Sequence, residues 1–148
     1  MEHLAHSLHL HPMLVHFPIA LFISALGFEA ASLIFKKENF HRTALFLYIA
    51  ATLMSPLAVQ TGLWEEARLQ IHHPVLETHE DFALLTMWSA LASLPILWFV
   101  HGFAAKRNPK IFRGVFLICV LFIVTTLSIA AYNGGKMVYE YDIGPDHP

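Results

Sequence analysis

The chain has 148 residues, of which 56% are hydrophobic and 14% are charged, and its formal net charge is −2. Soluble domains contain roughly 45–50% apolar residues and about 25% charged residues, so this composition excludes an ordinary soluble globular protein. The length suits a single domain, which we expect to cover residues 1–148.

Four segments are long, apolar and almost free of charge, and in chain order they cover residues 17–35, 43–63, 82–103 and 111–132. Each has about the 20 residues that a helix needs to cross the hydrocarbon core of a bilayer. Backbone polar groups in hydrocarbon must be paired within the segment, so each segment is predicted to be a helix. The expected fold class is all-α, an integral membrane four-helix bundle. We expect the first segment to remain as a helix rather than to act as a signal peptide, because no Lys or Arg precedes it.

The basic residues predict how these helices are oriented. Seven of the nine Lys and Arg residues lie in or beside the short connections after the first and third helices: Lys36, Lys37, Arg42, Lys106, Arg107, Lys110 and Arg113. The positive-inside bias places these connections in the cytoplasm, so both termini and the connection 64–81 face outward. The expected topology is therefore N-out, C-out, in a bacterial cytoplasmic (inner) membrane. Because this topology explains the basic clusters, nucleic acid is not an expected partner.

Histidines concentrate at the end that is predicted to face outward. Nine of the eleven belong there: His3, His6, His9, His11, His16, His72, His73, His79 and His147. His16 opens the first helix, and His79 lies in the first turns of the third, whether that helix starts at Pro74 or at a capping box of Thr78 and Asp81. Both helices run inward from the outer face, so the two imidazoles are expected at similar depth.

Each of these two histidines lies at the outer end of a helix face that carries mostly small residues. At about 100° per residue, the faces carry Ala20, Ile23, Gly27 and Ala30 below His16, and Ala83, Thr86, Ala90 and Ser93 below His79. Such faces leave room for a flat macrocycle between diagonal helices, and bundles hold cofactors with facing side chains in their cores. We therefore predict haem b with His16 and His79 as axial ligands of the iron. The alternative is ordinary close packing of small residues between membrane helices.

Other outer residues are candidates for supporting roles at this site. His11 and His72 are second choices, as alternative ligands or as partners of the haem propionates. Gln60 would hydrogen-bond a ligand imidazole, and the outer cations Arg68 and Lys136 would pair with propionates.

Two further groups of polar residues have both functional and non-functional interpretations. The N-terminal tail has a metal-binding composition without the spacing of a defined site, and its histidines are His3, His6, His9 and His11. Glu29 lies within the first helix, where a carboxylate suggests a proton route or a quinone contact. We favour the simpler interpretation, in which Glu29 extends toward the basic loop and His41 and His101 are interfacial residues.

The segment HPMLVHFPIAL, residues 11–21, resembles the hallmark of a widespread bacterial family of small four-helix membrane proteins, described as a domain of unknown function. Similarity extends to Thr61-Gly62-Leu63, to the histidine that opens the third helix (His79) and to GGKMVY at 134–139. The resemblance covers nearly the whole chain. Members are often associated with Rieske-type redox proteins, which implies electron transfer, although this chain has no Rieske-like set of Cys and His residues.

Three functions are compatible with these observations. The first is b-type cytochrome-like electron transfer between the quinone pool and an extracytoplasmic redox protein, by a carrier or subunit rather than a stand-alone enzyme. The second is binding of copper or zinc, for transport or delivery, by His11, His16, His72 and His79. The third is a structural role, as a homo-oligomer or as a subunit of a larger membrane complex.

Overall fold

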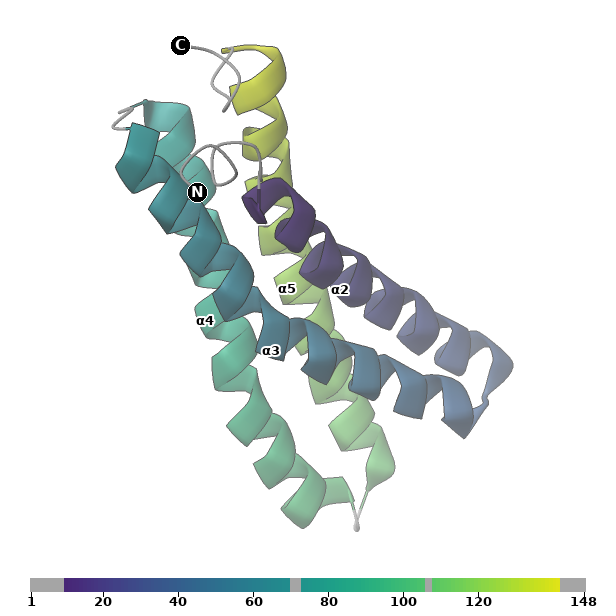
Figure 1. The fold of residues 1–148 in the computed structure, drawn as a ribbon. Coiled ribbons are helices and arrows are strands. Elements are labelled where there is room, and N and C mark those ends of the chain that lie inside the picture. Colours follow the sequence, from purple (N-terminus) through teal and green to yellow (C-terminus); the bar gives the residue numbers. More distant parts are fainter. Residues whose placement is uncertain (1–9, 70–72, 106–107, 142–148) are drawn as a thin grey trace.

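The computed structural model describes residues 10–69, 73–105 and 108–141, and it is built from four long helices joined by short connections (Figure 1). The helices are α2 (Leu10–Phe35), α3 (Glu38–Leu69), α4 (Pro74–Val100) and α5 (Pro109–Tyr139). A short π-helical segment, η1 (His101–Ala105), continues α4. All four long helices are long and apolar enough to cross a membrane, so the predicted all-α membrane fold is confirmed.

Three of the four predicted spans lie within these helices, and the third span, 82–103, runs from α4 into η1. Each helix continues beyond its span at the end predicted to face outward. The residues added are 10–16 in α2, 64–69 in α3, 74–81 in α4 and 133–139 in α5. These additions amount to about two helical turns per helix. The bundle therefore extends past its most apolar part at one end, and the histidines of interest lie on this extension.

Local sequence explains where the helices begin and end. The side chain of His73 caps α4 by accepting a hydrogen bond from the backbone N–H of Val75, and Pro74 occupies the first turn, as one of the two predicted starts requires. Asn108 and Pro109 repeat this arrangement at the start of α5. At the end of α2, Lys36 adopts a left-handed φ of 55°, a conformation typical of the residue after a helix.

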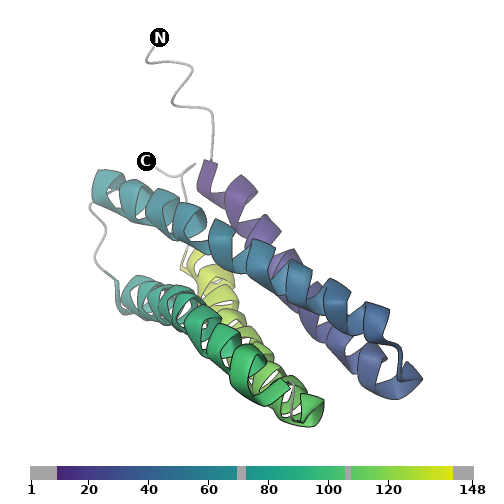
Figure 2. The same ribbon diagram turned by 90° about the horizontal axis from the view of Figure 1, so that it is seen from below.

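The helices form two hairpins, α2 with α3 and α4 with α5. Packing is much more extensive within each hairpin than between hairpins. Figures 1 and 2 show the hairpins close together near the start of α2 and the end of α5, and diverging toward the short connections. The two ends of the bundle therefore differ: one is packed around the interface between hairpins, and the other is open between α2 and α5.

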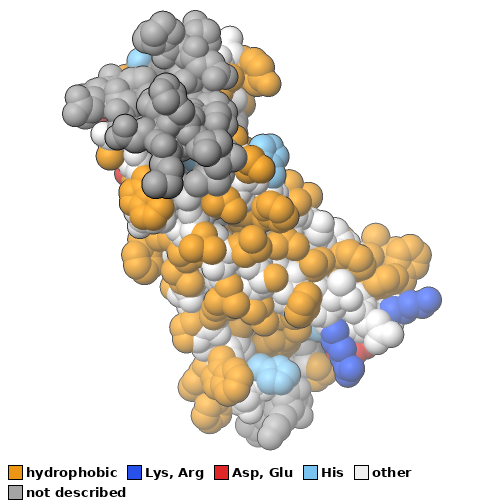
Figure 3. Space-filling view, in the orientation of Figure 1, with side chains coloured by type: hydrophobic (Ala, Val, Ile, Leu, Met, Phe, Trp, Pro, Cys, Tyr) orange, Lys and Arg blue, Asp and Glu red, His pale blue; other side chains and the backbone are white. Residues whose placement is uncertain are grey.

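Aromatic rings fill the centre where the hairpins meet. The ring of Tyr48 lies edge-on to Phe22 and Phe116, with ring centroids 5.4 Å apart in both pairs. Its hydroxyl is 2.7 Å from the hydroxyl of Ser93, which joins α3 to α4. Apolar side chains also cover much of the protein surface seen in Figure 3, as expected for helices that face lipid tails.

The core makes a direct prediction about stability. Replacement of Phe116 by Ala should lower the free energy of unfolding by about 3 kcal/mol, because a fully buried ring and its contacts with Tyr48 are lost. Phe122 on the same helix is 49% exposed, and Phe122→Ala should have much less effect. Unfolding in mixed detergent micelles checks both variants, and equal losses would contradict the described core.

Candidate functional site

His11 lies in the first turns of α2 and contacts α3. Its Nδ1 is 3.0 Å from the carbonyl oxygen of Ala58 and 3.3 Å from the hydroxyl of Thr61. A carbonyl oxygen can only accept a hydrogen bond, so Nδ1 must carry the proton. The other ring nitrogen, Nε2, then has a free lone pair in the neutral imidazole, which is the form that binds a metal.

His79 makes the same contact in the second hairpin. Its Nδ1 is 2.8 Å from the carbonyl oxygen of Ala130 on α5, so Nδ1 again donates and Nε2 again keeps its lone pair. Among the described residues, neither Nε2 has a hydrogen-bond partner. His11 on α2 and His79 on α4 both lie at the end of the bundle that is predicted to face outward. The structure thus brings together two imidazoles from different hairpins, both in the ligand-competent tautomer.

A glycine lets each histidine reach its carbonyl. A Cβ atom at Gly62 would lie 2.9 Å from Cε1 of His11, and a Cβ at Gly134 would lie 3.1 Å from Cε1 of His79. Each glycine is four residues after the alanine whose carbonyl is bound, so its own N–H is the helical partner of that carbonyl. The imidazole binds the second lone pair of the same oxygen and must lie against the glycine. A side chain at Gly62 would force a shift, and one at Gly134 would press against the ring of His79.

The two halves of the chain therefore repeat one motif. In each hairpin a histidine on the first helix binds an alanine carbonyl on the second, within the segments AVQTG at 58–62 and AAYNG at 130–134. Buried residues also keep the same register in both hairpins, in the pairs Ala25 and Ser93, Glu29 and Leu97, Ala44 and Phe116, and Tyr48 and Val120. Sequence reasoning missed this repeat because the motifs share only the alanine and the glycine.

His16, the predicted partner of His79, has a different environment. It is exposed, and its Nδ1 binds the carbonyl oxygen of Pro12 in its own helix. The face predicted below it is largely exposed, with Ala20, Gly27 and Ala30 on the surface and Ile23 53% accessible. The face below His79 is internal as predicted, and Thr86, Ala90 and Ser93 are buried. The α2 histidine that faces a neighbouring helix is instead His11, which lies about 140° from His16 around the helix.

The other predicted site residues are more scattered. Gln60 is exposed on α3. Lys136 is 3.5 Å from Glu140 and lies over the ring of Tyr132. The side chain of Arg68, the whole of His72 and the tail residues His3, His6 and His9 lie outside the described residues. Within the described ranges, no three His, Cys, Asp or Glu side chains are grouped as a metal site would require.

A second polar cluster lies toward the other end of the bundle, and here the sequence interpretation was wrong. Glu29 does not extend to the basic loop: it is fully buried, and its Oε2 lies 2.6 Å from Nδ1 of His41, itself only 4% exposed. The His41 ring packs edge-on between Phe112 and Phe116. Glu29 Oε1 has no partner among the described residues. His41 is thus a core residue that holds a buried carboxyl group.

This pair should be sensitive to the loss of one member. His41→Ala leaves the Glu29 carboxyl buried without its partner and should lower the free energy of unfolding by about 3 kcal/mol. The double variant Glu29→Leu/His41→Leu should recover most of that loss, because no polar group is then left unpaired. Glu38→Gln, at an exposed carboxylate of the same end, is the control. The measurement is the unfolding midpoint of each variant in detergent. A double variant as unstable as His41→Ala would contradict the claim that the loss comes from an unpaired Glu29 carboxyl.

Comparison with known proteins agrees with the fold. Neither a curated protein nor a solved structure matches the sequence. A family model described as predicted membrane protein (DUF2231) matches residues 7–147, a range that includes the HPMLVHFPIAL segment, both histidine motifs and all four helices. The family resemblance noted in the sequence is therefore confirmed, and the chain belongs to the DUF2231 family of predicted membrane proteins.

Proposed function

We propose that this protein binds one haem b between its two hairpins and acts as an electron carrier of a bacterial cytoplasmic membrane, with His11 and His79 as the axial ligands. The proposal depends mainly on one observation. Two imidazoles from different hairpins, at the same end of the bundle, each donate Nδ1–H to a backbone carbonyl and have no hydrogen-bond partner for Nε2 among the described residues. Metal-binding histidines characteristically use the second nitrogen in this way, because the hydrogen bond fixes the tautomer and the ring orientation.

The number of ligands favours haem over the copper or zinc alternative. Haem iron in bis-histidine cytochromes needs only two protein ligands, one on each side of the macrocycle. A structural zinc site needs four and a catalytic site three, and the described residues supply a pair. When bound, the haem would supply a one-electron iron couple.

The chain's own residues then have defined roles. Ala58 and Ala130 hold the two histidines in the neutral, iron-binding tautomer, and Gly62 and Gly134 admit the rings. Since the two histidines lie on the extension predicted to face outward, the haem would exchange electrons with quinone in the membrane and with an extracytoplasmic redox protein. Arg68 stays a predicted partner of the propionates. Lys136 would have to break its ion pair with Glu140 before it could bind a propionate.

The ligands can be tested by spectroscopy on the purified protein. We expect a Soret band, a sharp α-band on reduction with dithionite, and a low-spin bis-histidine signal in electron paramagnetic resonance. His11→Ala and His79→Ala should each abolish the low-spin signal, whereas His16→Ala should keep it because His16 points away from the site. Normal haem in both of the first two variants would refute the assigned ligands. A colourless protein with stoichiometric copper or zinc would replace the haem proposal with the metal-binding alternative.

The glycines allow a test that leaves both histidines in place. Gly62→Ala or Gly134→Ala puts a Cβ 2.9 or 3.1 Å from Cε1 of the imidazole, so the ring has to shift and haem content or the low-spin fraction should fall. The fold should not suffer from the backbone change, because Ala favours a helix over Gly by roughly 0.5–1 kcal/mol. Gly135→Ala is the matched control, since a Cβ there meets nothing within 4 Å. Unchanged haem in all three variants would show that the close ring–glycine contact does not matter for binding.

A further inference from the structure

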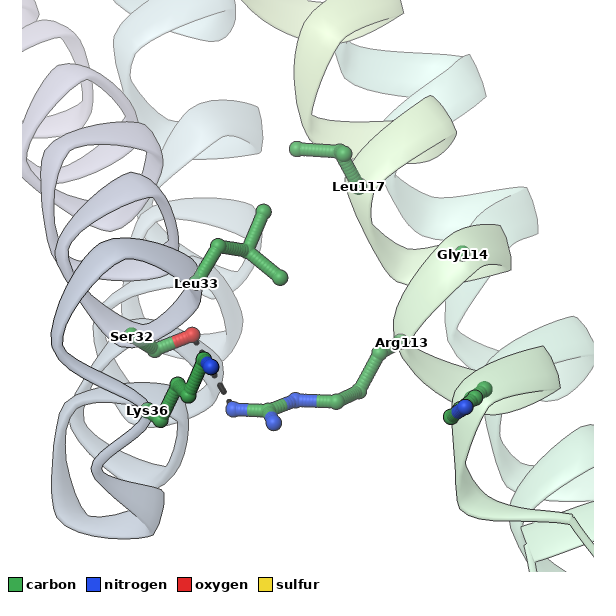
Figure 4. Close-up of a pocket in the computed structure, with 7 residues that line it drawn as sticks. Ser32, Leu33, Lys36, Arg113, Gly114 and Leu117 are labelled. Carbon is green, nitrogen blue, oxygen red and sulfur yellow. Dashed lines mark hydrogen bonds between the residues drawn. The ribbon is translucent and has the colours of Figure 1, made fainter.

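A second candidate site lies at the other end of the molecule, where the hairpins diverge. A pocket of about 420 Å³ opens there between α2 and α5. Its α2 side is formed by Ser32 and Leu33 with Lys36 just beyond the helix, and its α5 side includes Lys110, Arg113 and Leu117 (Figure 4). Ser32 is 21 positions after His11 in the same helix, a separation of about 30 Å. The pocket is therefore distinct from the histidine site and does not depend on its function.

The polar half of the pocket is strongly cationic. Three of its lining residues are Lys36, Lys110 and Arg113. Figure 4 shows Arg113 reaching across from α5, where its Nη2 donates a 3.0 Å hydrogen bond to the hydroxyl of Ser32. The carboxylate of Glu38 is 3.9 Å from Nη2, but its side chain is 59% exposed, so water screens its attraction. Among the described residues that line or contact the pocket, one acid thus opposes three bases.

Arg113 also has an unused hydrogen-bond donor. Its Nε is buried and has no partner among the described residues, although a buried donor without an acceptor is unfavourable. A guanidinium group offers planar, paired N–H donors that suit phosphate oxygens. Ser32 holds one of these donors in place and leaves others for a ligand. The arrangement is that of an anion site with one fixed arginine and two flexible lysines.

The other half of the pocket is apolar. Leu33 and Leu117 lie on its walls, on the side toward the membrane centre, and Gly114 adds no side chain (Figure 4). A ligand that fills the whole pocket therefore needs an anionic group and an adjoining hydrocarbon part. The basic connections place this end at the cytoplasmic face, where basic pockets between helices are suited to lipid head groups.

We propose that this pocket binds the phosphate group of an anionic membrane lipid of the inner leaflet. The lipid phosphate pairs with Arg113, Lys36 and Lys110, and its acyl chain follows Leu33 and Leu117. Free inorganic phosphate has the same head-group chemistry but no apolar part, so the two sources can be separated by experiment.

The experiment measures lipid bound to the full-length protein in neutral detergent by native mass spectrometry. Phosphatidylglycerol should bind, phosphatidylcholine should not, and millimolar inorganic phosphate should fail to displace phosphatidylglycerol. Arg113→Gln should weaken phosphatidylglycerol binding about tenfold or more, because a charge-assisted contact is lost. Lys37→Gln, which removes an exposed charge beside the pocket without touching its lining, should change binding less than about twofold.

A second variant tests the pocket without removing any charge. A Cβ at Gly114 meets nothing within 4 Å, so Gly114→Leu should fold and should fill the pocket. It should abolish phosphatidylglycerol binding, whereas Gly27→Leu, at another glycine with open space around it, should not. The proposal fails if Gly114→Leu binds normally, if Lys37→Gln is as damaging as Arg113→Gln, or if phosphatidylcholine binds equally well. Displacement by inorganic phosphate would overturn the lipid assignment and identify a free-phosphate site.

Discussion

Hydrocarbon offers no hydrogen-bond partners, and therefore each polar group buried in this bundle must find one within the protein. Hydroxyl groups meet this need locally: Thr52, Thr86 and Thr126 all donate to a backbone carbonyl one turn earlier in their own helix. The exposed His16 likewise uses the carbonyl of Pro12 in its own helix. His11 and His79 instead cross to the neighbouring helix of the hairpin and use a carbonyl there. This constraint creates both the close helix contacts and the candidate site.

The same constraint links the histidines to their glycines. The carbonyl oxygens of Ala58 and Ala130 already accept a hydrogen bond within their own helix. A second donor has to approach each oxygen beside the next helical turn, which carries Gly62 or Gly134. At Gly62 and Gly134 that turn has no side chain, and the rings occupy the space. Each hairpin thus carries one complete half-site, and the packing of one hairpin against the other brings the halves together. A ligand held by both histidines would also hold the two hairpins together at this end.

The two ends of the bundle bind their polar side chains in different ways. At the histidine end, the imidazoles donate Nδ1–H to backbone carbonyls. At the opposite end the hairpins separate, and Arg113 spans the gap to Ser32. Glu29 Oε2 pairs with Nδ1 of His41 in the core nearby. The first arrangement suits a metal-centred cofactor. The second suits an anion that approaches from the membrane surface.

The sequence by itself determined the four helices, because apolar length and backbone pairing in lipid leave no other solution. It also identified the family. Tertiary structure decided which histidine of α2 faces inward. Helical periodicity gives the angle between His11 and His16, but the rotation of α2 about its own axis depends on packing of Phe22 and Ala25 against the other helices. For the same reason, only the folded chain shows that Glu29 and His41 are partners, and that Gly62 and Gly134 lie beneath imidazole rings.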